Sequence, residues 1–173
     1  MPSGSRPEID ATSFRFAVVV SRFNNRITDR LLEGARQYFR DRGVPENHVE
    51  VFRCPGAFEL PQLALKIIAS RRVDAVVCLG AVIRGDTPHF EYVAGEAARG
   101  IQDVALRTGV PVTFGVLTTD TELQAVERAG GREGNKGWEA AASALEMANL
   151  FRTAAKRRTK SSTSRRRRGQ GRT

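Results

Sequence analysis

Four short segments rich in apolar residues, here called runs, alternate along the chain with segments whose apolar residues recur at helical spacing. The runs occupy residues 16–20, 49–53, 74–79 and 110–117. The first of them, residues 16–20, contains no polar residue, and a continuous apolar run of this length is typical of a parallel strand that is buried on both faces. Because parallel strands need long crossover connections, the alternation predicts one sheet with helices on both of its faces.

The segments between and after these runs predict helices. The first helix should begin behind an N-cap at Thr28 and stop at Gly43, and the third should begin at Pro88 behind an N-cap at Thr87. The others are expected over residues 61–70, 121–129 and 137–152. The predicted fold is a three-layer α/β/α sandwich with a four-stranded parallel sheet, doubly wound and flavodoxin-like. Such sheets bind ligands beyond the carboxyl ends of their strands, where the strand order reverses.

The net charge of +9 is concentrated at one end of the chain. Residues 152–173 hold ten Lys or Arg and no acidic residue, which leaves 18 basic and 19 acidic groups in residues 1–151. We therefore expect a flexible N-terminal arm over residues 1–13, a neutral folded body over residues 14–151, and a disordered basic tail over residues 152–173. The tail is either a solubilising extension or a segment that attracts nucleic acid or acidic cargo.

Several classes of protein are excluded by composition. With 40% hydrophobic and 27% charged residues the chain is not wholly disordered. Its longest apolar run, residues 75–83, is much shorter than the roughly 20 residues that span a bilayer, and residues 1–10 do not resemble a signal peptide. We expect a cytoplasmic protein without a membrane partner. Cys54 and Cys78 lie in apolar surroundings without metal-ligand spacing, so we expect buried, reduced thiols and no metal site.

The most informative loop, residues 80–89, follows the third apolar run and leads into a helix. Gly80 and Gly85 allow the main chain to approach a ligand closely, and the free N–H groups of a helix N-terminus favour a phosphate. His89 supplies a group that exchanges protons near neutral pH. The alternative is a surface histidine without a chemical role.

Aromatic residues and a carboxylate gather at other strand ends. Residues 56–61 place Phe58 beside Glu59 after the second run, and Phe23 and Phe114 lie at or near further strand ends. An aromatic ring stacks on a planar heterocycle, and a carboxylate accepts hydrogen bonds from sugar-like hydroxyls. The alternative is that the three rings belong to the core.

Two basic residues, Arg128 and Lys136, flank a glycine-rich turn over residues 130–137. Arginine binds phosphate bidentately, although charge at a helix end can also stand without a ligand. The chain has no P-loop, no G-x-G-x-x-G sequence, no Cys-x-x-Cys pair, and no acidic residues after the first and third strands as receiver domains require. Spacing alone therefore predicts a site for a phosphate and a planar ring, with a histidine beside them.

Five sequence blocks occur in order: Ser-Arg-Phe-Asn at 21–24, Pro-Gly-Ala-Phe-Glu-Leu-Pro at 55–61, residues 79–89, Phe-Gly-Val-Leu-Thr-Thr-Asp at 114–120, and Glu-Arg-Ala-Gly at 127–130 with Asn-Lys-Gly at 135–137. Together they resemble the 6,7-dimethyl-8-ribityllumazine synthase family over about residues 14–151. The resemblance implies an enzyme of riboflavin biosynthesis. It would condense 5-amino-6-(D-ribitylamino)uracil with 3,4-dihydroxy-2-butanone 4-phosphate, releasing phosphate and water, without metal or organic cofactor.

The resemblance also implies roles for individual residues. His89 would move protons. The ribitylaminouracil would contact Phe23, Ala57, Phe58, Glu59, Ala81, Val82, Ile83 and, from a neighbouring subunit, Phe114. The phosphate would contact Asp86, Thr87 and Arg128, with Arg84, Gly85 and Lys136 as further candidates. At Asp86 the main chain rather than the side chain would bind.

Assembly is implied as well. A pocket completed by Phe114 of a neighbour requires a homo-oligomer, and the family forms pentamers, some of which pack into sixty-subunit shells. Residues 134–137 resemble shell-forming members, whereas residues 131–133 depart from their commoner pattern. Riboflavin synthase is a further candidate partner. The competing interpretation is a nucleic-acid-binding scaffold that keeps the fold without the catalysis.

Overall fold

The computed structural model describes residues 9–168, with side chains described for residues 9–155. Its centre is a four-stranded parallel sheet in the order β2-β1-β3-β4. The strands are β1 (Phe16–Ser21), β2 (Val49–Cys54), β3 (Ala75–Ile83) and β4 (Val112–Thr119). Since the chain adds β2 on one side of β1 and β3 on the other, the strand order reverses between β1 and β3. The predicted four-stranded parallel sheet is confirmed.

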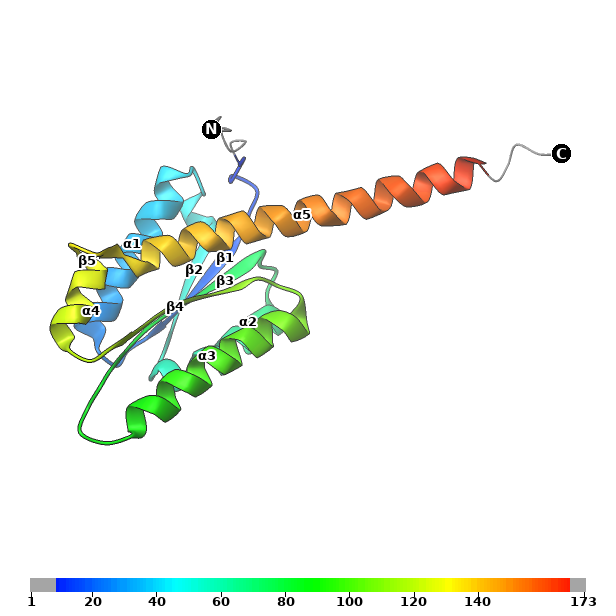
Figure 1. Ribbon diagram of the computed structural model, residues 1–173. Coiled ribbons are helices and arrows are strands. Elements are labelled where there is room, and N and C mark those ends of the chain that lie inside the picture. The colour runs from blue at the N-terminus through cyan, green and yellow to red at the C-terminus, as the bar shows by residue number, and fades with distance from the viewer. Residues whose placement is uncertain (1–8, 169–173) are drawn as a thin grey trace, which may run out of the picture.

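Helices cover both faces of this sheet (Figure 1). One face carries α1 (Asn25–Asp41), α4 (Glu122–Arg128) and α5 (Lys136–Arg168), and the other carries α2 (Leu60–Ser70) and α3 (His89–Thr108). Two 3-10 turns, η1 (Glu46–His48) and η2 (Ala57–Glu59), and a small hairpin of β5 (Ala129–Gly131) and β6 (Gly134–Asn135) complete the fold. The predicted three-layer sandwich is therefore confirmed.

The apolar run of β1 reflects burial on both faces. Val18 and Val20 pack in the core beneath α1 and α5, whereas Ala17 and Val19 pack in the core beneath α2 and α3. All six residues of β1 are buried. Because consecutive side chains of a strand point to opposite faces, a strand between two helical layers has no polar face.

Several element ends differ from the sequence predictions. Helix α1 begins at Asn25, so Thr28 is not its N-cap; the Thr28 side chain is buried and its hydroxyl donates to the Ser21 carbonyl oxygen at 2.8 Å. Strand β3 continues to Ile83, beyond the expected end at residue 79, because β4 pairs with it as far as Thr119. Helix α3 begins at His89, one residue later than expected.

Helix α5 also differs from its expected end near residue 152, because it continues to Arg168 and extends beyond the sheet in Figure 1. Arg152 belongs to the folded body: its guanidinium contacts Asp74 at 3.2 Å and Ser13 at 2.7 Å, and lies 3.5 Å from the centre of the Phe14 ring. The disordered tail predicted over residues 152–173 thus has a helical backbone as far as Arg168. Residues 169–173 lie outside the described residues.

The predicted N-terminal arm falls partly outside the described residues, which exclude residues 1–8. Within its described part, Ala11 is buried in the core beneath α1 and α5. In the part of the chain that the structure describes, no helix combines the length and apolarity needed to cross a membrane.

The start of α5 packs directly on the backbone of α1. A Cβ atom built on Gly137 would contact the Leu31 carbonyl oxygen and lie 2.6 Å from its carbonyl carbon. The Leu31 carbonyl group and residue 137 both belong to helix backbones, so neither can move aside without shifting a helix. The two helices can approach this closely only because residue 137 has no side chain.

We expect Gly137→Ala to destabilise the protein by roughly 1–3 kcal/mol, the usual effect of overpacking. The measurement is urea unfolding followed by circular dichroism. Gly95→Ala is the matched control, because Gly95 lies within α3 with open space around its Cβ position, and alanine favours helix over glycine by about 1 kcal/mol. Equal unfolding midpoints for Gly137→Ala and the wild type would contradict the packing argument.

Candidate active site

A cavity of about 680 Å³ opens at the carboxyl ends of β1, β2 and β3, beside the N-terminus of α3. Its size is typical of small-molecule sites, and its position is where the strand order reverses. Ten of the residues predicted to bind substrate or move protons line it: Phe23, Ala57, Phe58, Glu59, Ala81, Val82, Ile83, Gly85, Thr87 and His89. The structure thus brings most of the predicted site together.

The first wall is the segment that leaves β1. The Arg22 amide donates to the Cys54 carbonyl at 2.8 Å, and the Phe23 amide donates to the Pro55 carbonyl at 2.9 Å. These two bonds prolong the pairing of β1 with β2 beyond the strand ends. The Phe23 side chain is 70% exposed, so it is a ring at the cavity and not a core residue. Phe58 and Phe114 are likewise exposed, which excludes the core interpretation for all three rings.

The second wall is the turn η2, which follows β2. Oε2 of Glu59 accepts a hydrogen bond from the Gly56 amide at 2.9 Å, and this bond orients the carboxylate at the cavity edge. Ala57 is buried below it, and Phe58 is exposed beside it. A carboxylate held next to an open aromatic ring suits a ligand that combines hydroxyl groups with a planar ring.

The third wall combines the end of β3 with the segment that leads into α3. Ala81, Val82 and Ile83 line the cavity from within β3. The sequence had predicted a loop for these residues, and that prediction is wrong. Gly85, Thr87 and His89 follow, all of them exposed. Because α3 begins at His89, the positive end of its dipole faces this segment and favours an anion there.

Arg84 fastens this segment but does not line the cavity. Its Nε lies 2.7 Å from Oδ1 of Asp120 and its Nη1 lies 2.7 Å from Oε1 of Glu91. The hydrogen bond to Asp120, and next the one to Glu91, raise the pKa of Arg84 above its ordinary value. The guanidinium also lies 4.3 Å from the centre of the Phe90 ring. It therefore links the ends of β3 and β4 to the start of α3.

Five predicted or candidate residues do not line the cavity of their own chain: Arg84, Asp86, Phe114, Arg128 and Lys136. Phe114 lies on the edge strand β4 opposite Cys78, with its side chain 45% exposed. Arg128 ends α4 and donates to the Gln124 carbonyl at 3.2 Å, and Lys136 pairs with Glu139 at 2.7 Å.

The cavity has a fourth wall that was not predicted from the sequence. Phe90, Tyr92 and Val93 line the cavity from the first turn of α3. Tyr92 is 71% exposed. The available signal was helical spacing, because residues three and four positions after His89 share its face of a helix.

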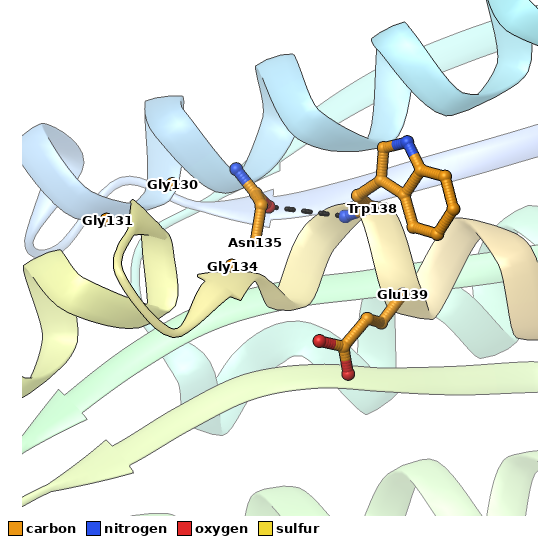
Figure 2. Close-up of a pocket in the computed structure, with 6 residues that line it drawn as sticks. All are labelled: Gly130, Gly131, Gly134, Asn135, Trp138 and Glu139. Atoms are coloured by element: carbon orange, nitrogen blue, oxygen red, sulfur yellow. Dashed lines mark hydrogen bonds between the residues drawn. The ribbon is translucent and has the colours of Figure 1, made fainter.

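A second, smaller cavity of about 480 Å³ lies between the β5–β6 hairpin and the start of α5 (Figure 2). Oδ1 of Asn135 accepts from the Gly137 and Trp138 amides, and its Nδ2 donates to the Arg30 carbonyl at 2.9 Å. These bonds tie the hairpin to α1 and α5. We assign this cavity a structural role because the Asn135 side-chain amide that lines it is hydrogen-bonded to the backbones of α1 and α5.

The structure confirms that both cysteines are buried and neither forms a disulfide. Burial raises the pKa of Cys54 to about 11, with a smaller contribution from the Glu59 carboxylate. Burial also raises the pKa of Cys78. Neither thiol is therefore a nucleophile near neutral pH. Among residues 9–168, no cluster of three or more His, Cys, Asp or Glu could hold a metal ion.

Fold and cavity together define an α/β protein with a small-molecule site at the switch point of a doubly wound sheet. The family model described as 6,7-dimethyl-8-ribityllumazine synthase matches residues 13–152. A curated relative from Syntrophus aciditrophicus (strain SB), named 6,7-dimethyl-8-ribityllumazine synthase, is 53% identical over 152 residues, which are 88% of this chain and 99% of the relative. The chain belongs to the 6,7-dimethyl-8-ribityllumazine synthase family, and the resemblance drawn from the sequence is confirmed.

A de novo designed Rossmann fold protein is 19% identical, with a TM-score of 0.35, over 64% of this chain and 90% of that chain.

We expect both thiols of the native protein to react slowly with a disulfide reagent at pH 8 and to react rapidly in guanidinium chloride. The raised pKa means that the folded state holds the Cys54 proton more tightly than the unfolded state. Its contribution to stability is therefore present below about pH 9 and is lost as the pH rises towards 11. The free energy of unfolding of the wild type, measured in urea relative to that of Cys54→Ala, should therefore fall as the pH rises from about 9 towards 11. A rapidly reacting native thiol at pH 8 would contradict the burial argument.

Proposed function

We propose that this protein condenses 5-amino-6-(D-ribitylamino)uracil with 3,4-dihydroxy-2-butanone 4-phosphate to form 6,7-dimethyl-8-ribityllumazine, in riboflavin biosynthesis. The observation that carries the proposal is the convergence of ten family-matched residues on one cavity. The family membership of residues 13–152 supports it independently.

The two substrates fit different parts of the cavity. The open ring of Phe23 would stack on the pyrimidine, and the oriented Glu59 carboxylate would accept hydrogen bonds from the ribityl hydroxyls. In the described sheet β1 pairs with β3 only as far as Leu79, and the Asn24 amide engages the Ala81 carbonyl beyond it, so the ring edge would meet β3 at its last residues, past Ala81. The phosphate would bind at residues 85–87, near the N-terminus of α3.

The chemistry needs proton transfers and close approach more than a strong nucleophile. The uracil's free amine attacks the ketone and water leaves as an imine forms. Phosphate is then eliminated, and the second nitrogen closes the ring with loss of further water. His89 lines the cavity next to the proposed phosphate site, where an imidazole can pass protons between the substrates. Because amines and ketones condense unaided, most of the acceleration should come from holding the partners together.

We expect His89→Ala to retain activity, with a loss of about 100-fold or less, at the lower end of what general acid–base catalysis contributes. The assay mixes the two substrates and follows the fluorescent lumazine. His48→Ala is the control, because His48 lies on η1 against the Phe14 carbonyl and does not line the cavity. A folded wild-type protein that forms no lumazine would overturn the proposed function, whereas complete inactivity of folded His89→Ala would overturn the proximity argument.

We also propose that active sites are shared between copies of the chain. Phe114 does not line the cavity of its own chain, and it is exposed on the edge strand β4. If its ring completes a neighbour's cavity, the contact joins different surfaces of two identical subunits and must close into a ring. A pentamer is the ring that the family resemblance favours. The sixty-subunit shell, the riboflavin synthase partner and the cytoplasmic location remain predictions from the sequence.

Mixed assemblies test this sharing. Hybrids of Phe23→Ala and Phe114→Ala chains should be more active than either pure variant, because some sites then combine an intact Phe23 with an intact Phe114 from the neighbour. Hybrids of Phe23→Ala and Phe58→Ala are the control. Both of these residues line the cavity of one chain, so no site regains both rings. Activity equal to the average of the pure variants in the first mixture would contradict sharing.

A second function is favoured by the charge of the C-terminal segment. We propose that residues 156–173 bind nucleic acid. With Arg152 engaged by the body, they hold nine Lys or Arg and no acidic residue, and they lie beyond the family match. Several such segments on one oligomer would bind a polyanion with high avidity.

We expect nucleic acid to remain bound to the full chain at low salt and to be released steeply as the salt concentration rises, because counterions are displaced on binding. A variant that ends at Ala155 should lose this retention while keeping the contacts of Arg152 and the enzymatic activity. The measurement is the ratio of absorbance at 260 and 280 nm during salt elution. Equal retention by the shortened variant would exclude the segment as the binding site.

A further inference from the structure

The segment between Phe23 and α1 contains an unusual backbone conformation. Asn24 has φ 57° and ψ 43°. Among the described residues it is the one residue other than glycine that has a positive φ. Its carbonyl oxygen accepts the first bonds of α1, from Ile27 at 2.9 Å and Thr28 at 3.0 Å. Asparagine tolerates this left-handed conformation better than most residues, although it remains strained relative to glycine.

The Asn24 side chain does not cap α1, although asparagine commonly does so at this position. Its Nδ2 instead donates to the Ala81 carbonyl oxygen of β3 at 2.9 Å, across 57 positions of sequence. The pairing of β1 with β3 stops at Val20 and Leu79, two residues before Ala81. The amide thus takes the place of the missing strand neighbour for a carbonyl that would otherwise lack a partner on that side.

The bond from Asn24 to Ala81 fixes the backbone next to Phe23 on the β3 side, whereas the Phe23 amide is fixed on the β2 side. The Phe23 amide is bound to the Pro55 carbonyl beyond β2, and the next residue is bound to β3. Phe23 therefore lies between the segment that follows β2 and the end of β3, at the cavity. Because its ring is 70% exposed, few packing contacts orient it, and its backbone must set the direction of the ring.

The proposed phosphate segment is held by different groups. Arg84 ties it to Asp120 and Glu91, and its amide donates to the Thr119 carbonyl at 2.8 Å. Asn24 takes no part in these contacts. A change at Asn24 should therefore disturb the position of the ring of Phe23 and leave the phosphate segment in place.

We propose that Asn24 is a positioning residue that sets the subsite for the planar ring of the substrate, by linking Phe23 to the Ala81 carbonyl of β3. This inference rests on the proposed function, because the planar ring is that of the ribitylaminouracil. It predicts an effect on one substrate and not on the other.

Three variants separate the side-chain bond from the backbone conformation. Asn24→Asp keeps the shape and the tolerance of positive φ, but a carboxylate cannot donate to the Ala81 carbonyl. Asn24→Gly relieves the backbone strain and removes the amide. Both should raise the KM for the ribitylaminouracil roughly 3- to 10-fold, as expected for one lost hydrogen bond, and leave the KM for the sugar phosphate within about twofold. Asn24→Ala loses both features and should show the largest increase.

A double-mutant cycle shows whether Asn24 acts through Phe23. In a Phe23→Ala background, Asn24→Asp should change the KM for the ribitylaminouracil by less than about twofold, because the ring that it positions is absent. The same fold-change in both backgrounds, equal changes in both KM values, or no change in any variant would overturn the inference. If the wild type forms lumazine and Asn24→Asp behaves like it, this inference alone fails. A wild type that neither forms lumazine nor binds the ribitylaminouracil overturns the proposed function and this inference together.

Discussion

The pairing of β1 with two neighbours is the constraint on which the site depends. β1 forms parallel ladders with β2 on one side and β3 on the other, and both ladders end at nearly the same level, at Ser21 with Cys54 and at Val20 with Leu79. Beyond that level β3 continues to Ile83 beside β4, whereas β1 and β2 end and lead to α1 and η2. The cavity lies where they separate, so the depth and position of the site follow from the register of the sheet.

Two sets of polar contacts stabilise the mouth of this cavity. On the β1 side, main-chain bonds to β2 and the Asn24 amide hold the segment that carries Phe23. On the α3 side, the ion pairs of Arg84 hold the segment that carries His89. Each set lies beyond the last paired residues of the strands that it joins. Long-range polar bonds therefore position the exposed residues of the site, such as Phe23, whereas Ala57 and Ala81 are held by packing in the core.

Sequence reasoning placed the strands and most of the cavity-lining residues correctly, but it failed where distant residues decide the local structure. β3 ends at Ile83 and not at the predicted residue 79, because β4 pairs with it as far as Ile83. A single run of apolar residues cannot reveal such a pairing. Thr28 has the chemistry of an N-cap, yet it is buried and donates to Ser21, because Asn24 starts α1 earlier. Arg84 suited a phosphate contact, although Asp120 and Glu91 engage its guanidinium.

By itself the amino-acid sequence determined the layered α/β fold, the family and a list of candidate residues that includes most of those lining the cavity. These follow from apolar runs, helical spacing and loop motifs, which are local patterns. Tertiary structure alone determined which candidates share one cavity, and it separated Phe114, Arg128 and Lys136 from the rest. It also revealed the bond from Asn24 to Ala81. The reason is physical: strand register and long-range hydrogen bonds join residues that are far apart in the chain, and no local pattern encodes such distances.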